Sequence, residues 1–125
     1  CVKEKINVVS LPGPTAFVPA ITKSGFPCDR FVFEGFLPHK KGRAERLAAI
    51  KEEKRAVVLY ESPHRILRLL KETDELLGSD RLVSVSREIS KIYEETKTGS
   101  PADLHEYFSK NKPKGEFVVV IDALK

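Results

Sequence analysis

Apolar positions along the chain predict about five β-strands. Ala56–Tyr60 and Phe117–Ile121 are continuous apolar runs, which are typical of central strands covered on both faces. Phe31–Phe36 is rich in aromatic residues, and Leu82–Arg87 alternates between apolar and polar positions, as strands with one buried face do. Ile92–Thr98 is more polar, which favours a place at the edge of the sheet.

Helical spacing of apolar residues predicts four helices between these strands. The helices cover Thr15–Ser24, Gly42–Glu53, Ser62–Leu77 and a segment that begins at Ser100–Pro101. The third helix starts with a Ser-Pro pair, so we expect its serine to be the N-cap and its proline to take the first helical position.

Helices interleaved with about five strands predict an α/β fold, in which helices flank a mixed sheet. The two strands around Ser86–Ile92 are too close in sequence for a helical crossover, so we expect them to be antiparallel. Residues 6–11 are expected to form an extended lead-in that Pro12-Gly13-Pro14 closes. A length of 125 residues suits a single domain, 1–125.

Composition narrows the cellular setting. No apolar run approaches the roughly 20 residues that a membrane-spanning helix needs, so we expect no membrane partner. The two cysteines, Cys1 and Cys28, form neither a disulfide framework nor a spaced metal motif. We therefore expect a reducing cytoplasm and no metal site.

Positive charge is concentrated in one segment. Between Pro38 and Arg55, seven basic residues face three acidic ones, and this excess of +4 equals the net charge of the whole chain. Clustered Lys and Arg attract phosphate, and nucleic acid is the commonest polyanionic partner, although a solvated helix face explains such a run as well.

Three short segments carry the candidate chemistry. Leu11–Ala16 is a turn of small residues and prolines, which lets a ligand approach backbone amides. Tyr60–Arg65 lies where a buried strand ends and a helix begins, the position where open α/β sheets bind ligands. Ser86–Glu95 ends one strand and begins the next. An ordinary turn, a helix cap and a salt-bridged hairpin explain the same three segments without a ligand.

The sequence contains no motif for three other classes of site: a phosphate-binding loop, a serine nucleophile and a reactive cysteine. The sequence has no Gly-rich phosphate loop and no Ser-centred nucleophile elbow, and the residues around Cys28 offer that thiol no activating group.

Five segments in this order resemble the small-subunit rRNA methyltransferases of the tetrapyrrole methylase superfamily: Leu11–Ala16, Gly25–Pro27, Asp29–Pro38, Tyr60–Arg65 and Ser86–Glu95. The resemblance covers nearly the whole chain. It implies two α/β domains with S-adenosylmethionine in the cleft between them. It also implies methyl transfer to the ribose 2′-hydroxyl of a cytidine in small-subunit (16S) rRNA, free or in the assembled small subunit.

The resemblance further implies that this chain is the C-terminal domain of a longer enzyme. Residues 1–12 then form the interdomain connection, and the N-terminal domain, with its own Gly-rich loop, is absent. A chain that begins at Cys1 and has no methionine is a weak sign in the same direction. We therefore expect the isolated chain to be inactive and the full-length enzyme to be a homodimer.

Family motifs assign roles to individual residues of this chain. Relatives often have Ser where Thr15 stands, and Leu and Thr where Ile89 and Ser90 stand. The cofactor contacts fall on Pro12, Gly13, Pro14, Thr15, Ala16, Tyr60, Glu61, Arg87, Glu88 and Ile89.

Methyl transfer to a hydroxyl needs a base for the hydroxyl proton. Glu88 and Lys91 are the two candidates, and Lys91 requires a pKa lowered by burial to act as one. The expected RNA contacts are Lys40, Lys41, Arg43, Arg46, His64 and Arg65.

Two other functions fit the same segments. One is a methylase of porphyrin-type small molecules, which belongs to the same superfamily. The other is an RNA-binding module without catalytic activity, which predicts tight RNA binding by this chain alone.

Overall fold

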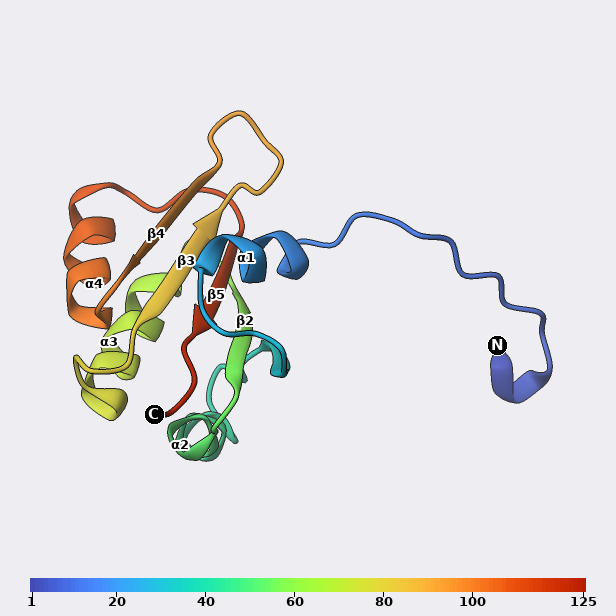
Figure 1. Cartoon of the computed structure of the whole chain (residues 1–125), viewed down its shortest axis with the longest axis horizontal. Helices are drawn as coiled ribbons and strands as arrows, with labels where there is room; N and C mark the ends of the chain where they lie inside the picture. Colours follow the sequence, from blue (N-terminus) through green and yellow to red (C-terminus); the bar gives the residue numbers. More distant parts are fainter.

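The computed structural model describes residues 1–125 and contains a five-stranded mixed sheet with four α-helices (Figure 1). The fold class predicted from the apolar pattern is therefore confirmed. In chain order the elements are the short 3₁₀ helix η1 (Val2–Glu4), α1 (Phe17–Ser24), β1 (Phe31–Phe36), α2 (Arg43–Glu52), β2 (Ala56–Glu61), α3 (Ile66–Leu77), β3 (Val83–Arg87), β4 (Glu95–Gly99), α4 (Pro101–Lys110) and β5 (Phe117–Ile121).

The strand order in the sheet is β1-β2-β5-β3-β4. β1 and β2 are parallel and are joined through α2, whereas β5 is antiparallel to both β2 and β3. β3 and β4 form the expected antiparallel pair, and the polar β4 is an edge strand as predicted. Strands β1, β2 and β3 therefore point in the same direction, and their carboxyl ends lie at one edge of the sheet.

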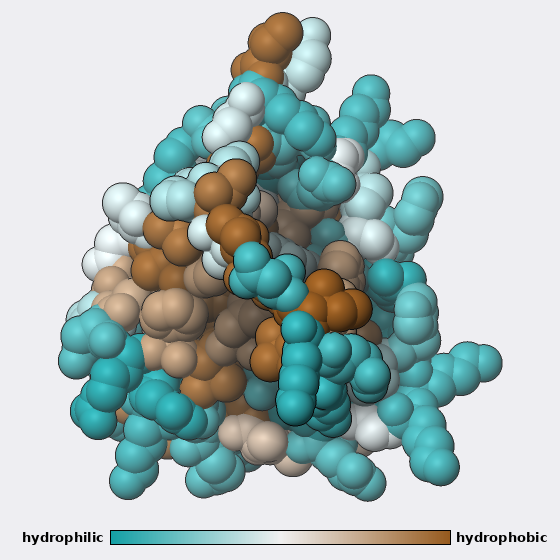
Figure 2. All heavy atoms as spheres, turned by 90° about the vertical axis from the view of Figure 1, so that its right-hand side faces the viewer, coloured by the Kyte–Doolittle hydropathy of each residue, from teal (hydrophilic) through white to brown (hydrophobic).

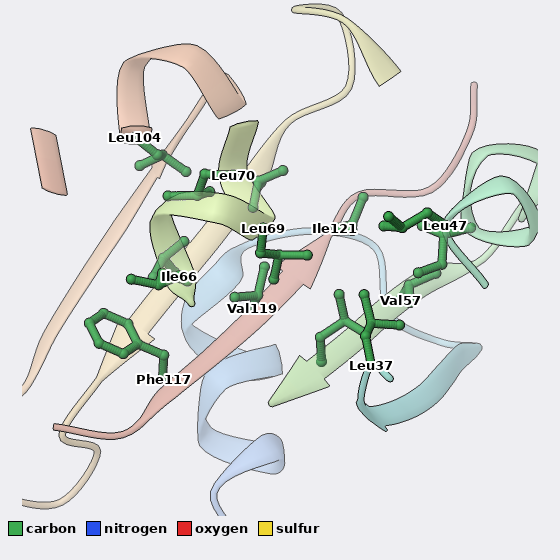
Figure 3. Packing of buried hydrophobic residues seen from close by; sticks show 14 of the residues in the cluster. Leu37, Leu47, Val57, Ile66, Leu69, Leu70, Leu104, Phe117, Val119 and Ile121 are labelled. Atoms are coloured by element: carbon green, nitrogen blue, oxygen red, sulfur yellow. The ribbon is translucent and has the colours of Figure 1, made fainter. Parts of the chain in front are cut away.

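One face of the sheet carries most of the core (Figure 3). Helices α2, α3 and α4 contribute Leu47, Ile66, Leu69 and other apolar residues to a cluster of 15 buried side chains. Each large apolar side chain buried in this way stabilises the fold by roughly 1.5–3 kcal/mol. We refer to this face as the three-helix face.

The opposite face is covered by α1 alone, and we refer to it as the α1 face. Its buried cluster has only five members, Ala20 among them. Phe17 of α1 lies against Phe33 of the edge strand β1, with ring centroids 5.1 Å apart, yet Phe33 remains 47% exposed. Figure 2 looks from the side toward which the N-terminal segment extends, and hydrophobic side chains gather across the middle of that view.

Residues 6–16 form the extended lead-in, which runs away from the sheet (Figure 1). All of them are exposed, including Ile6, Val9 and Leu11. None of the helices is both long and apolar enough to cross a membrane.

The predicted start of the third helix is wrong. α3 begins at Ile66, and its N-cap is Arg65, which makes no side-chain cap hydrogen bond. The Ser62 carbonyl accepts the N–H groups of Arg65 and Ile66, each at 3.1 Å, so residues 62–65 form a separate turn. The Ser62 hydroxyl is consequently free of the capping role.

The start of the fourth strand also differs from the prediction. Residues 88–94 form a loop, and β4 begins only at Glu95. Glu88 and Ser90 have φ angles of 51° and 65°, a left-handed conformation that turns the chain away from the sheet before it can pair. Ile92 and Tyr93 lie in this loop, 94% and 74% exposed.

Candidate functional site

A cavity of about 390 Å³ opens at the edge of the sheet where β1, β2 and β3 end. Its volume lies in the range of small-molecule sites, and half of its lining residues are hydrophobic. The lining comes from the α1 lead-in, the ends of β1 and β2, and the start of β5: Ala16, Phe36, Tyr60, Glu61, Ser62, Pro63, Gly115, Glu116, Phe117 and Val118. This is the edge at which ligands bind in open α/β sheets.

Glu61 lines the cavity and is buried, with only 3% exposure. Its carboxylate accepts hydrogen bonds from the Ser62 N–H at 2.8 Å and from Arg65 Nε at 3.1 Å. A buried carboxylate needs such hydrogen bonds to replace those that it loses with water. Both bonds are local, so Glu61 orders the turn that follows β2.

Two other side chains give the cavity its chemistry. Tyr60 packs against Phe33 and Phe36, with ring centroids 5.2 and 5.7 Å away, and these rings form an aromatic wall. The Ser62 hydroxyl oxygen is inaccessible to solvent and has no hydrogen-bond partner. An unpaired buried hydroxyl is unfavourable unless a ligand satisfies it, so Ser62 is suited to bind a polar group in this cavity.

The structure brings together only some of the predicted cofactor residues. Ala16, Tyr60 and Glu61 line the cavity. Pro12–Thr15 are exposed on the lead-in immediately before Ala16. Arg87, Glu88 and Ile89 lie at the same edge but do not line the cavity; Ile89 packs with the apolar cluster of the α1 face.

Sequence reasoning missed the lining between Gly115 and Val118. Gly115 has a φ of 85°, which favours glycine, and Glu116 follows it directly before β5. A lone glycine after Pro113-Lys114 is an ordinary loop signal in the sequence, so nothing there distinguished this turn from any other. Phe36, Ser62 and Pro63 were also outside the predicted set.

The surroundings of the two predicted bases, Glu88 and Lys91, shift both pKa values in the direction that makes each a poorer proton acceptor at neutral pH. A hydrogen bond from the Glu116 N–H, helped by Lys91, holds the pKa of the Glu88 carboxyl below its ordinary value. Hydrogen bonds to Glu88 and Glu116 raise the pKa of Lys91, whose side chain is 52% exposed. The lowered pKa that Lys91 would need in order to act as a base is therefore not found, because ion pairing at the surface favours the charged amine.

Arg43 does not lie on the surface where an RNA contact was predicted. Its residue exposure is 3%, and its guanidinium binds Glu72 of α3 and the Pro38 carbonyl. This buried ion pair fastens α2 to α3, and it leaves Arg43 without a surface on which to meet a phosphate. Arg46 is exposed but pairs with Glu34.

We call the remaining basic residues of this region the basic surface: Lys40, Lys41, His64, Arg65 and Arg68. Like Arg46, two of them are ion-paired, Arg65 with Glu61 and Arg68 with Glu72. Arg65 Nη1 lies 3.2 Å from His39 Nδ1, and Arg68 Nη1 donates to the His39 carbonyl at 3.2 Å. These contacts attach the loop that carries Lys40 and Lys41 to α3. Arg68 had no signal in the linear segment, since it joins this surface only through the fold.

Comparison with known proteins decides the family. The family model for tetrapyrrole (corrin/porphyrin) methylases matches residues 1–105. The chain belongs to this methylase family. The predicted superfamily is therefore confirmed.

Several curated relatives of this methylase chain carry one name. The chain is 42% identical to "Ribosomal RNA small subunit methyltransferase I" of Thermotoga maritima, over 98% of this chain and 55% of that protein. It is 40% identical to the protein of the same name from Escherichia coli O157:H7, over 100% of this chain and 45% of that protein. The chain thus spans about half the length of the curated relatives that it matches.

Solved structures show the same fold at low identity. Cobalt precorrin-4 methyltransferase CbiF superimposes with a TM-score of 0.69 at 16% identity, over 95% of this chain and 54% of that protein. The methyltransferase CobJ gives a TM-score of 0.65 at 20% identity, over 90% of this chain and 49% of that protein. These likenesses show the fold of the domain.

Proposed function

We propose that this methylase chain is the C-terminal domain of an S-adenosylmethionine-dependent methyltransferase that acts on small-subunit rRNA. The observation that carries the proposal is the identity of about 40% to relatives of that name over nearly the whole chain. The convergence of the ordered segments at one edge of the sheet supports it. We further propose that the acceptor is a cytidine ribose 2′-hydroxyl of 16S rRNA, and that the reaction takes place in the cytoplasm.

The cavity fits a nucleoside-type methyl donor. Bound S-adenosylmethionine carries the methyl group on a sulfonium sulfur. The thioether that remains after methyl transfer is a good leaving group. Tyr60 and Phe36 offer aromatic surface to a planar base, the unpaired Ser62 hydroxyl offers a hydrogen bond, and the small Ala16 leaves room for the ligand. We assign no base, because hydrogen bonds lower the pKa of Glu88 and so weaken it as a proton acceptor, while ion pairing raises the pKa of Lys91 and favours the ammonium, which cannot accept a proton.

We propose that a second domain completes the site. The chain matches about half of each relative, and the α1 face leaves Val18, Phe33 and Phe36 between 47% and 61% exposed beside the cavity. Apolar surface of this kind marks a contact with another domain. The isolated chain should therefore bind S-adenosylmethionine too weakly to measure by titration calorimetry, and micromolar affinity would show that the site is complete without a second domain. We propose a homodimer for the full-length enzyme.

The basic surface is the proposed RNA contact. Replacement of Lys40 and Lys41 by alanine in the full-length enzyme should weaken rRNA binding. It should also lower the slope of log affinity against log salt by about 0.7–0.9 for each phosphate that the variant no longer binds. Lys110→Ala, on α4 at 72% side-chain exposure, is the matched control and should leave the slope unchanged. An equal slope in the double variant would remove this surface from the RNA interface.

The decisive experiment is a methylation assay with the full-length enzyme. Small ribosomal subunits from cells that lack the enzyme should acquire one 2′-O-methylcytidine, detected by mass spectrometry of nuclease digests. Methylation of a base instead would contradict the proposed acceptor. The family description and the CbiF fold keep a tetrapyrrole-type substrate as the second candidate, and methyl transfer to a porphyrin-type acceptor would favour it. Tight RNA binding without any methyl transfer would favour the RNA-binding module.

A further inference from the structure

The turn at Glu88 and the turn at Gly115-Glu116 are joined by two reciprocal hydrogen bonds. The Glu88 N–H donates to the Glu116 carbonyl at 3.0 Å, and the Glu116 N–H donates to Glu88 Oε1 at 2.9 Å. The two turns lie just beyond Arg87 and Phe117, the last paired residues of β3 and β5. The Glu88 side chain therefore continues the pairing of these strands past the end of the sheet.

The backbone around this contact is held in an uncommon conformation. Glu88 has a φ of 51°, in the left-handed region that non-glycine residues seldom occupy. Such a conformation persists only where surrounding contacts determine it, and it is commonest at functional sites. The carboxylate is held from a second side as well, because Lys91 Nζ lies 3.2 Å from Glu88 Oε2 and 3.3 Å from Glu116 Oε2.

Gly115 makes close approach of the carboxylate possible. A side chain at this position would collide with Cγ, Cδ and Oε1 of Glu88. The Glu88 carboxylate therefore lies directly against the Gly115-Glu116 turn. Gly115 and Glu116 in turn line the cavity together with Ala16, Tyr60 and Ser62. Glu88 itself does not line the cavity, so it can influence a ligand there only through the turn.

We propose that Glu88 is a positioning residue, whose carboxylate holds the Gly115-Glu116 turn in the shape that the cavity needs to bind the methyl donor. This inference rests on the proposed function and assigns Glu88 a role other than proton transfer. A side chain that only accepts a hydrogen bond from a backbone N–H needs an acceptor oxygen, and this oxygen does not have to be charged. An amide can therefore replace the carboxylate. A general base cannot be replaced in that way.

Replacement by glutamine and by alanine in the full-length enzyme separates the two roles. Glu88→Gln keeps Oε1 as an acceptor for the Glu116 N–H, so kcat and its pH profile should stay close to those of the wild type. Glu88→Ala should raise the KM for S-adenosylmethionine about fivefold to tenfold, the effect of one missing hydrogen bond, with a smaller change in kcat. A loss of 10²–10⁴-fold in kcat for Glu88→Gln, with loss of the acidic limb of the pH profile, would overturn the proposal in favour of a base.

Two further variants test whether the effect passes through the turn. Glu94→Ala removes the Ser90 N–H bond and the Lys23 ion pair in the same loop but leaves the Glu88–Glu116 contact, so its KM should equal that of the wild type. Gly115→Ala should raise KM by itself, and Glu88→Ala should add little in the double variant because the collision is then relieved. Multiplicative effects of the two changes would contradict a shared turn.

A measurement on this 125-residue chain separates the contact from the function. The Glu116 amide proton should be protected from exchange in the wild type and in Glu88→Gln, and unprotected in Glu88→Ala, as measured by NMR. Loss of protection in Glu88→Ala with an unchanged KM would overturn the positioning role and leave the proposed function intact. Absence of S-adenosylmethionine binding by the full-length wild type would overturn both.

Discussion

The two faces of the sheet differ in how many helices cover them. The three-helix face buries a cluster of 15 side chains under α2, α3 and α4, whereas the α1 face buries five and leaves Phe33 and Phe36 half exposed. The hydrophobic effect scales with apolar area removed from water, so the first face supplies most of the folding free energy. The second face borders the cavity and keeps apolar surface available for contact. Stability and proposed activity are thus divided between opposite faces of one sheet.

Matched replacements of phenylalanine on the two faces should give the largest contrast. Phe108 of α4 is 2% exposed, and Phe108→Ala should lower the free energy of unfolding by about 3–5 kcal/mol. Phe36 is 61% exposed and contacts Tyr60 at its ring, so Phe36→Ala should cost below about 1.5 kcal/mol. Urea unfolding measures both losses, and equal values would show that the two faces contribute alike.

Loss of the ion pair between Arg43 and Glu72, which joins α2 to α3, should give the next largest effect on stability. Arg43→Ala leaves the Glu72 carboxylate in a site that is 22% exposed, without the guanidinium that binds it at both oxygens. We expect a loss of about 3 kcal/mol, at the low end for a buried pair because Glu72 keeps some solvent and Arg68. Lys71→Ala, which removes a pair at the 4.0 Å limit on the same helix, is the control and should change stability by less than about 0.5 kcal/mol.

The same pair should make stability depend on acid pH. Burial raises the pKa of Glu72, but hydrogen bonds from Arg43 and Arg68 outweigh burial and bring the pKa below its ordinary value. A carboxyl with a lowered folded-state pKa stabilises the protein above its unfolded pKa of about 4.3, and this contribution is lost as the pH falls through the folded pKa. The stability difference between the wild type and Glu72→Gln should therefore be constant near pH 7 and shrink below about pH 4.3. A difference that grows in acid would contradict this sign.

The smallest effect is expected on the α1 face. Val18 is 51% exposed on α1, so Val18→Lys should change the free energy of unfolding by less than about 0.5 kcal/mol. If this face contacts another domain in the full-length enzyme, the same change there should lower the melting temperature, since it places a charge in an apolar interface. A large loss in the isolated chain would show that Val18 belongs to the core.

Local patterns predicted the sheet well because its strands are defined by burial. Phe31–Phe36 and Phe117–Ile121 are strands with the predicted bounds, and Ser100 caps α4 by accepting the Asp103 N–H. Ser62 failed as a cap because its backbone carbonyl, and not its hydroxyl, accepts the N–H groups of Arg65 and Ile66, which leaves the hydroxyl unpaired. A dipeptide rule does not include such competition.

Contacts between distant segments explain the other differences. Arg43 looked like one more surface cation, but its partner Glu72 lies 29 residues further along the chain. Lys91 would need burial to act as a base, whereas the fold places Glu116, 25 residues away, beside it. The Gly115-Glu116 turn likewise contacts Glu88, which lies 28 residues from Glu116 in the sequence. Sequence segments identify residues of the candidate site, but only the fold determines which charged side chains contact one another.

Strand β5 follows the other four strands in the sequence and occupies the centre of the sheet. It pairs with β2 and β3, which lie far earlier in the sequence, so the two halves of the sheet have no common neighbour until residues 117–121 leave the ribosome. Pairing between distant segments is slow, because the entropy of loop closure must be overcome before the contacts form. We therefore expect β1–β2 and β3–β4 to join into one sheet only after β5 has been synthesised.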